Sequence, residues 1–292
     1  MELSILYRGP LASCDYDCAY CPFAKRRDTP AQLRADRAAL SRFVGWVREQ
    51  TDDRISVLLT PWGEALTRSW YRDAMVELSH LGHVARVAVQ TNLSCRLDWM
   101  EGADLDTLAL WCTYHPDQVA FERFADKHRG LVSRGVRHSI GIVGLPEHLQ
   151  AAQRMAALLA EDQADGTYLW INAAEGHTYT DAEAAQWTLL DPLFAYSRLP
   201  HPSQGRACRT GETVVSVDGE GRVRRCHFVP KDDPAEVLGN LYDGSFRAAL
   251  RPRRCPQRMC DCHIGYVHMP ELGLYERFGD GVLERLLSST PL

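Results

Sequence analysis

Residues 3–21 read L-S-I-L-Y-R-G-P-L-A-S-C-D-Y-D-C-A-Y-C, an apolar strand-like run followed by a loop that carries three cysteines. Cys14, Cys18 and Cys21 have the spacing C-x3-C-x2-C, and the aromatic Tyr20 stands directly before the last of them. A closed structural zinc site takes four protein ligands, whereas this loop supplies only three. Three thiolates on a four-iron cluster would leave one iron open to another molecule. The loop therefore predicts an iron–sulfur cluster with one open coordination position.

Strand-like runs alternate with longer helix-like segments over the first two thirds of the chain. The expected strands are 3–7, 54–60, 84–91, 108–114, 138–143 and 168–172. A first helix should begin with Thr29 as its cap and Pro30 at its first position, and others are expected over 69–81, 118–134 and 147–161. This alternation predicts an α/β fold with a parallel sheet and right-handed crossovers. Six units predict a partial (β/α)6 TIM-like barrel.

The pattern changes near residue 200. Segments 212–217 and 223–228 flank the turn D-G-E-G at 218–221 and predict a hairpin. A stretch rich in cysteine, with a proline, follows at 251–263. We therefore expect a barrel domain over 1–199 and a small hairpin-containing domain over 200–292.

The composition and charge of the chain argue against several classes of function. The 292 residues carry a net charge of −5 with a pI near 6.1, which argues against nucleic-acid binding because such affinity rests on phosphate neutralisation. The cluster Lys25-Arg26-Arg27 is better explained as a solvated loop face or a contact for a small anion. No signal peptide or membrane-spanning run is evident, so a cytoplasmic location is expected. Ten cysteines should then be reduced thiols, metal ligands or catalytic groups.

The C-x3-C-x2-C loop resembles that of the radical SAM superfamily, in which the open iron holds the amino and carboxylate groups of S-adenosylmethionine (SAM). Functional groups of parallel barrels follow the carboxyl ends of strands. After the second expected strand comes T-P-W-G-E-A-L at 60–66, which is similar to the family's Gly-Gly-Glu-Pro loop for the SAM ammonium. Gly63 and Glu64 match that loop, whereas Trp62 and Ala65 depart from it.

Two more strand ends resemble the family's SAM-binding segments. Gln90-Thr91-Asn92 is similar to its ribose-contacting turn, although a turn asparagine needs no such role. I-G-I-V-G-L-P-E at 140–147 resembles the segment beside the adenine, with Ile140 in place of the first glycine. The alternative there is a strand glycine before a helix that starts at Pro146. The SAM-binding residues implied by the resemblance are Gly63, Glu64, Gln90, Asn92, Ile142, Gly144 and Glu147.

Five cysteines lie in the last third of the chain. Cys208 and Cys226 are joined by C-x12-G-x4-C, which resembles the opening of the SPASM and twitch domains, and Gly239-Asn240 matches a later segment of those domains. The tail supplies C-x4-C-x-C, and its cysteines are Cys255, Cys260 and Cys262. The resemblance implies one auxiliary four-iron cluster held by four of the five thiols. A zinc site on the same residues is the alternative.

Two residues are candidates for the chemistry of the substrate. Cys112 lies within the fourth expected strand, where a thiol facing the barrel could return a hydrogen atom to a substrate radical. A small buried hydrophobic role is the preferred interpretation of Cys112. His115 ends the same strand and either contacts SAM or substrate or caps the strand before Pro116.

Membership of this superfamily implies reductive cleavage of SAM to a 5′-deoxyadenosyl radical that abstracts hydrogen from a substrate, with electrons from a flavodoxin- or ferredoxin-type partner. We expect oxidation or rearrangement of a small polar substrate, assisted by the auxiliary cluster. The cluster loop starts at residue 14 with no leader-binding domain before it, which favours a small molecule over a peptide. A maturase that modifies or crosslinks a peptide is the alternative within this chemistry. An iron–sulfur electron carrier and a zinc-bound structural module are alternatives of other classes, and the oligomeric state stays open.

Overall fold

The computed structural model describes residues 1–24, 26–161, 166–229 and 236–288, so Lys25 of the basic cluster lies outside the described residues. Within these ranges the main sheet has nine strands in the order β11-β10-β9-β1-β2-β3-β4-β5-β6. Strands β1 to β6 pair in parallel, β9 joins the free edge of β1 in parallel, and β10 and β11 continue antiparallel. The predicted partial barrel of six parallel strands is confirmed.

The strands of this sheet are β1 Glu2–Arg8, β2 Arg54–Leu59, β3 Val84–Thr91, β4 Leu108–Thr113, β5 Arg137–Val143, β6 Leu169–Asn172, β9 Val214–Asp218, β10 Arg222–Arg224 and β11 Val237–Asn240. Two short ladders join the C-terminal segments, and their strands are β7 His201–Pro202 with β13 Met259–Cys260, and β8 Ala207–Cys208 with β12 Arg253–Arg254.

The α-helices are α1 Pro30–Glu49, α2 Ser69–Ser79, α3 Phe121–Val132, α4 Leu149–Glu161, α5 Asp181–Leu190, α6 Phe194–Arg198, α7 His263–Tyr266 and α8 Leu274–Phe278. Short 3-10 helices are η1 Ala65–Thr67, η2 Asp98–Gly102, η3 Pro146–His148, η5 Arg247–Ala249, η6 Pro270–Leu272 and η7 Gly279–Gly281. Only the 3-10 helix η2 stands between β3 and β4 in place of an α-helix.

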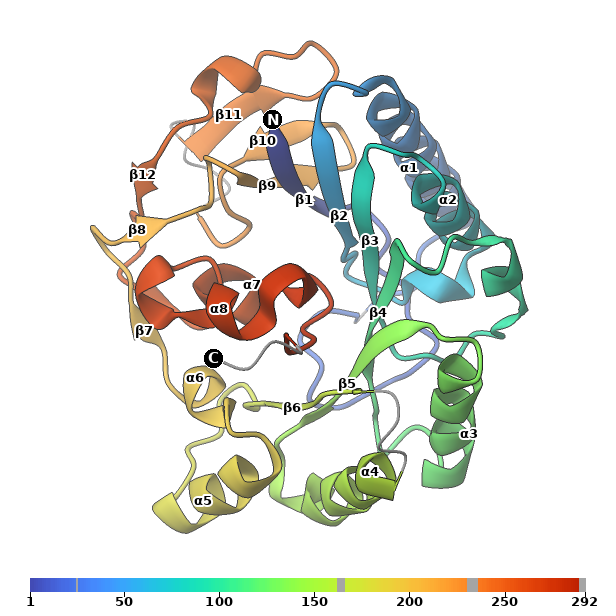
Figure 1. Ribbon diagram of the computed structural model, residues 1–292, viewed down its shortest axis with the longest axis vertical. Coiled ribbons are helices and arrows are strands. Elements are labelled where there is room, and N and C mark those ends of the chain that lie inside the picture. Colours follow the sequence, from blue (N-terminus) through green and yellow to red (C-terminus); the bar gives the residue numbers. More distant parts are fainter. Residues whose placement is uncertain (25, 162–165, 230–235, 289–292) are drawn as a thin grey trace.

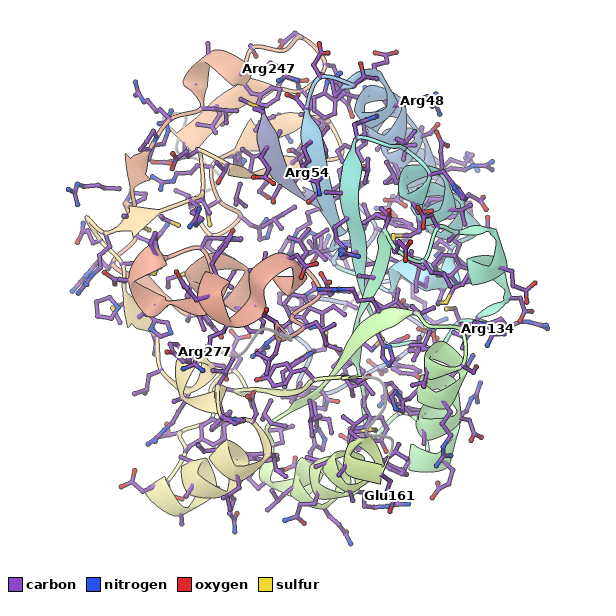
Figure 2. The ribbon with its side chains drawn as sticks, viewed as in Figure 1. Arg48, Arg54, Arg134, Glu161, Arg247 and Arg277 are labelled. Carbon is purple, nitrogen blue, oxygen red and sulfur yellow. The ribbon has the colours of Figure 1, made fainter. Side chains whose placement is uncertain are left out.

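The curved sheet separates two cores. Helices α1 to α4 cover its outer side, while α7 and α8, in red, lie on its inner side (Figure 1). Strand alternation sends Ile5 to the outer core and Leu6 to the inner core, where it joins Trp111 and Trp170. Polar groups of the outer helices point away from the sheet, as Arg48 and Glu161 do at the edge of the molecule (Figure 2).

Helix α1 begins where the sequence indicates. The Thr29 hydroxyl accepts a hydrogen bond from the Gln32 amide at 3.3 Å, and the Gln32 side chain accepts one from the Thr29 amide at 2.8 Å. This reciprocal capping box, with Pro30 at the first position, fixes the start of the helix. The loop between β1 and α1 therefore ends at a defined point, and that loop contains the three cysteines.

The segment after residue 199 continues the barrel. Hairpin strands β9 and β10 extend the main sheet from its β1 edge, and the turn between them contains Gly221 with a φ of +78°. Helices α7 and α8 pack their apolar side chains, among them Ile264 and Phe278, onto the inner faces of the barrel strands. The main sheet and the inner core therefore both contain residues from each side of the expected domain boundary at 199/200. The division into two domains stays a prediction. Across the described ranges, every helix lacks the combination of length and apolar character that crossing a bilayer requires.

Candidate functional site

The three-cysteine loop is held by carboxylates at and near the start of α1. One oxygen of Asp28 accepts hydrogen bonds from the Ala12 amide at 2.9 Å and from the amide and hydroxyl of Ser13, each at 2.8 Å. Buried Asp36 accepts a bond from the Leu11 amide at 3.1 Å. The backbone just before Cys14 is therefore fixed by hydrogen bonds, together with the packing of Leu11 in the outer core.

Cys18 lies within electrostatic reach of both other thiols of this loop. Cys18 is buried, while Cys14 and Cys21 are partly exposed. Burial raises the pKa of Cys14 to about 12 and also raises that of Cys18, and in each case a neighbouring cysteine of the loop adds to the rise. Thiols that resist ionisation in this way become thiolates when a metal replaces the proton.

Gly63 allows the loop after β2 to touch the cysteine loop. The Gly63 amide donates to the Leu11 carbonyl at 3.1 Å, and the Glu64 amide donates to the Ser13 carbonyl at 3.0 Å. A Cβ atom on Gly63 would stand 2.0 Å from the Ser13 carbonyl oxygen, so only glycine fits. The two loops are thus bound backbone to backbone.

The Glu64 carboxylate connects the ends of β2 and β3. It is 5% exposed and accepts hydrogen bonds from the Thr91 hydroxyl and the Asn92 amide, each at 2.7 Å, and from the Leu66 amide at 3.0 Å. Burial raises its pKa to about 7, although these hydrogen bonds oppose the rise. Because its oxygens are engaged by the chain itself, Glu64 positions the Asn92 turn.

The Asn92 side chain completes the link back to the cysteines. Its amide nitrogen donates to Asp15 at 2.9 Å, and its amide oxygen accepts from the Ser94 amide at 3.0 Å. On the inner face of the sheet, the Gln90 side chain accepts a hydrogen bond from the Thr60 hydroxyl. The structure therefore brings Gly63, Glu64 and Asn92 together beside the cysteine loop.

The β5 residues are arranged differently. The Ile142 side chain is fully buried in the outer core, on the side of the sheet that the helices cover. The Gly144 amide donates to the Asn172 carbonyl at 2.8 Å, and its carbonyl accepts from the Tyr179 hydroxyl at 2.9 Å. Glu147 is exposed in η3. Of these residues, only the backbone of Gly144 lies at the strand end where a cofactor contact is expected.

Cys112 and His115, both from the β4 region, lie on different sides of the sheet: one in the outer core and the other beside the cysteine loop. Cys112 has 0% exposure and packs in the outer core, so it does not belong to the proposed site. His115 faces the cysteine loop, with its Nδ1 atom 2.9 Å from the Tyr20 hydroxyl and 3.4 Å from the Cys18 sulfur. Burial lowers the pKa of His115 to about 4, so the ring is neutral at pH 7. The sequence could not tell what His115 contacts, and the structure shows that it contacts Tyr20 and Cys18.

Four C-terminal cysteines lie in or shortly after short strands: Cys208 in β8, Cys226 after β10, Cys255 after β12 and Cys260 in β13. Cys208 in β8 stands opposite Arg253 in β12, and the Cys255 amide after β12 donates to the Arg206 carbonyl at 2.8 Å. Burial raises the pKa of Cys226 to about 12, with Cys208 and Cys255 adding to the rise. Burial likewise raises the pKa of Cys260, with added rises from Cys226, Cys262, Cys255 and Cys208.

The fifth of these cysteines, Cys262, also adds to the pKa rise of Cys260 but has charged neighbours of its own. Burial raises the pKa of Cys262 to about 11, while the charges of Arg8 and Arg285 act in the opposite direction. Neither arginine belongs to a motif in the sequence, which is why sequence reasoning missed both. Cys262 therefore borders the inner face of the barrel.

Among the side chains that the structure describes, no three of His, Cys, Asp and Glu converge so as to hold a single metal ion. This geometric test concerns one ion, whereas the thiolates of a four-iron cluster bind different irons.

A pocket of about 740 Å3 opens beside the cysteine loop. Arg26 and Arg27 of the basic cluster line it together with Phe23, Asp28 and Trp62. The Trp62 ring also packs against the His227 ring, with 5.1 Å between the two ring centroids. The guanidinium carbon of Arg8 lies 4.2 Å from the Trp62 ring centroid. The pocket thus shares a wall with the inner side of the barrel.

No family model matches the chain, and neither does any curated protein. Solved structures of similar fold do exist. "Native anSMEcpe with bound AdoMet" superposes with a TM-score of 0.55 at 13% identity, covering 85% of this chain and 83% of that one. "Native anSMEcpe with bound AdoMet and Cp18Cys peptide" gives a TM-score of 0.54 at 13% identity, covering 85% of this chain and 82% of that one. Such a likeness establishes the fold alone: this chain has the fold of anSMEcpe.

Proposed function

We propose that the chain is a radical SAM enzyme that binds a four-iron cluster through Cys14, Cys18 and Cys21. The single observation that carries this proposal is the contact between the cysteine loop and the loop after β2, where Gly63 and Ser13 meet backbone to backbone. That contact puts three thiols next to the strand ends that resemble SAM-binding segments. A solved structure of the same fold has AdoMet bound, which supports the proposal.

The residues present fit such a cluster. Three soft thiol ligands stand in one loop, and hydrogen bonds to half-buried Asp28 and to buried Asp36 hold the backbone that carries them. The cluster, when bound with SAM, supplies the electron for reductive cleavage, and the protein orients the reactants and excludes water.

The chain's own groups have definite tasks in this scheme. Glu64 fixes the Asn92 turn through its three hydrogen bonds, so that the Asn92 amide stays beside Cys14 and Asp15. The neutral His115 ring and Tyr20 cover Cys18 and shield it from water. These groups build a preorganised and partly dry site rather than carry out proton transfer.

For the auxiliary cluster we propose Cys208, Cys226, Cys255 and Cys260 as ligands. Mutual effects on their pKa values support this choice. Cys262 is left outside the set because no cysteine is among the main causes of its own pKa shift, although it adds to the rise at Cys260. Four thiols are also the donor set of a structural zinc ion, although no three of them converge on one ion position within the described residues. Metal analysis decides between the two.

Within this chemistry, hydrogen abstraction from a small polar substrate followed by oxidation or rearrangement is the first candidate reaction. Modification of a peptide is the second, and it is favoured by one observation: the anSMEcpe structure of the same fold has the Cp18Cys peptide bound.

The direct test of the proposal replaces Cys14, Cys18 and Cys21 together with alanine. We expect reductive cleavage of SAM to disappear in the reconstituted protein while the auxiliary cluster is retained, measured as 5′-deoxyadenosine and as iron. Cys112→Ala is the matched control, because this thiol is buried away from the loop. Persistent 5′-deoxyadenosine formation in the triple variant would refute the assignment.

A further inference from the structure

The pocket beside the cysteine loop has a basic and aromatic rim that the proposed function does not use. Arg26 and Arg27 line this pocket together with Phe23 and Trp62, and these four residues make up its basic surface. Both arginines are exposed, and neither side chain has a hydrogen-bond or ion-pair partner among the residues that the structure describes. Phe23 is 53% exposed, and its ring centroid lies 5.3 Å from that of Trp62.

Positive charge continues from the basic surface along α1. Gln32 of the first helical turn also lines the pocket, and Arg34 and Arg37 follow in the second turn, both exposed. The acids of the same segment are engaged by the chain itself, since Asp36 is 1% exposed and Asp28 accepts three hydrogen bonds from the cysteine loop. The surface charge here is therefore positive, although the whole chain has a net charge of −5.

This combination of side chains is typical of a binding surface for another protein. Aromatic and arginine side chains are enriched at protein–protein interfaces and supply much of their binding energy. An ordinary solvated loop has no need of a phenylalanine that is more than half exposed. Arginines without a partner in the described ranges attract an acidic molecule from a distance and pair with its carboxylates on contact. The basic surface therefore fits a protein with an acidic face.

The basic surface adjoins the proposed cluster site. Phe23 stands two residues after Cys21, whose side chain is partly exposed. Trp62 belongs to the loop after β2, which is bound to the cysteine loop backbone to backbone through Gly63. Electron transfer between proteins slows steeply with distance, so an electron donor has to dock on the surface next to the cluster that it reduces. Charge, exposed aromatic area and position thus agree on one kind of partner.

We propose that the basic surface docks an acidic electron-carrier protein that reduces the cluster bound by Cys14, Cys18 and Cys21. This inference rests on the proposed function, because each SAM cleavage that releases 5′-deoxyadenosine consumes one electron from outside the chain. In the docked complex the carrier is oxidised by one electron and the cluster is reduced by it, and no bond forms or breaks at the surface. The arginine forks pair with carboxylates of the carrier, while Phe23 supplies an apolar contact.

Docking is tested with a flavodoxin of strongly negative net charge as the probe, on the anaerobically reconstituted full chain. At low salt, the double change Arg26→Glu and Arg27→Glu should weaken the affinity about tenfold, because the reversed charges repel the acidic probe. The affinity of the wild type should also fall as salt is added, and that of the double variant should fall less. Phe23→Ala should weaken binding while its salt dependence stays that of the wild type.

The double change Arg129→Glu and Arg277→Glu is the matched control. It alters the net charge by the same amount at two exposed arginines, which lie in α3 and α8 and outside the basic surface. We expect this control to keep the affinity of the wild type within about twofold, because charges beyond a Debye length of the probe are screened.

SAM cleavage is then measured as 5′-deoxyadenosine with two electron sources. One is the same flavodoxin, kept reduced by flavodoxin reductase and NADPH, and the other is photoreduced 5-deazariboflavin, a neutral small molecule that needs no docking surface. With subsaturating flavodoxin, the variant changed at Arg26 and Arg27 should lose most of the wild-type rate. With deazariboflavin it should keep that rate, which also shows that the variant is folded and contains its cluster.

The outcomes separate this inference from the proposed function. Flavodoxin binding that depends on Arg26 and Arg27, in a protein that cleaves no SAM with either electron source, keeps the docking surface and removes the radical SAM assignment. Cleavage by both sources that ignores the charge reversal keeps the assignment and overturns the docking surface, and an acidic peptide is then the next occupant to test. Equal loss of rate with both sources overturns it as well, because the arginines would then serve the SAM site itself.

Discussion

Gly63 is the residue on which the cysteine loop depends most directly. Its missing side chain lets Leu11 and Ser13 bond to the loop after β2, and a Cβ atom there would overlap the Ser13 carbonyl oxygen at 2.0 Å. Real Cβ atoms do not approach so closely, and because the obstacle is backbone, the loop itself would have to move.

We therefore expect Gly63→Ala to lower both the Tm and the affinity for SAM, measured by thermal unfolding and by equilibrium binding. Gly45→Ala is the matched control, because Gly45 lies inside α1 with no atom within 4 Å of an added Cβ. That change should stabilise the protein by about 0.5–1 kcal/mol, since alanine favours the helix. Equal effects of the two changes on SAM affinity would contradict the role given to Gly63.

Because of Glu64, the free energy of unfolding of the protein should depend on pH. Burial raises its folded pKa from 4.5 to about 7, so the folded state holds a proton that the unfolded state releases. Its contribution to stability is therefore complete below pH 4.5 and is lost as the pH rises through 7.

Between pH 5 and pH 8 the wild-type protein should lose about 2.5 kcal/mol relative to Glu64→Gln, which does not titrate. Urea unfolding of both proteins at the two pH values measures this difference. If the two stabilities change in parallel with pH, the carboxyl is ionised throughout and the argument fails.

At the scale of elements, the six barrel strands were predictable because each is a short apolar run that ends in a turn. Helix α1 was predictable because Thr29 and Pro30 mark its start. The hairpin was also foreseen, but nothing in its sequence says that β9 pairs with the edge of β1. Helices α7 and α8 are four and five residues long, too short for a periodic pattern to reveal their buried position.

Some residues of the candidate site could be predicted from the sequence, and others could not. The loop cysteines, Gly63, Glu64 and Asn92 follow strand ends, and parallel strands bring such ends together. Alternation puts Cys112 and Thr113 on opposite faces of β4 but cannot tell which face is inside. Arg8 and Arg285 belong to no motif, and only the folded chain shows that the first packs on Trp62 and the second on Trp170.

The short C-terminal elements give a prediction about ligand choice. Cys226→Ala should remove about four irons per chain, because it takes away one of four thiols that the structure groups together. Cys262→Ala should retain them, because no other cysteine is among the main influences on this thiol. Iron analysis of both reconstituted variants is the measurement, and equal iron loss in the two would place Cys262 among the ligands.

At the scale of the whole molecule, one sheet carries both proposed cluster sites. The cysteine loop follows β1, which pairs with β2 along one edge. The hairpin that precedes Cys226 pairs with β1 along its opposite edge, through β9. The inner core then joins the barrel strands to α7 and α8, so the C-terminal segment closes the side of the barrel on which Arg8 and Arg285 lie.

The measurement that tests the central claim most directly is a count of iron, acid-labile sulfide and zinc in the anaerobically reconstituted wild-type chain. Two four-iron clusters predict about eight irons and eight sulfides per chain, with no zinc. Zinc without iron and sulfide would contradict the account, because the thiols of the loop after β1 would then belong to a structural metal site.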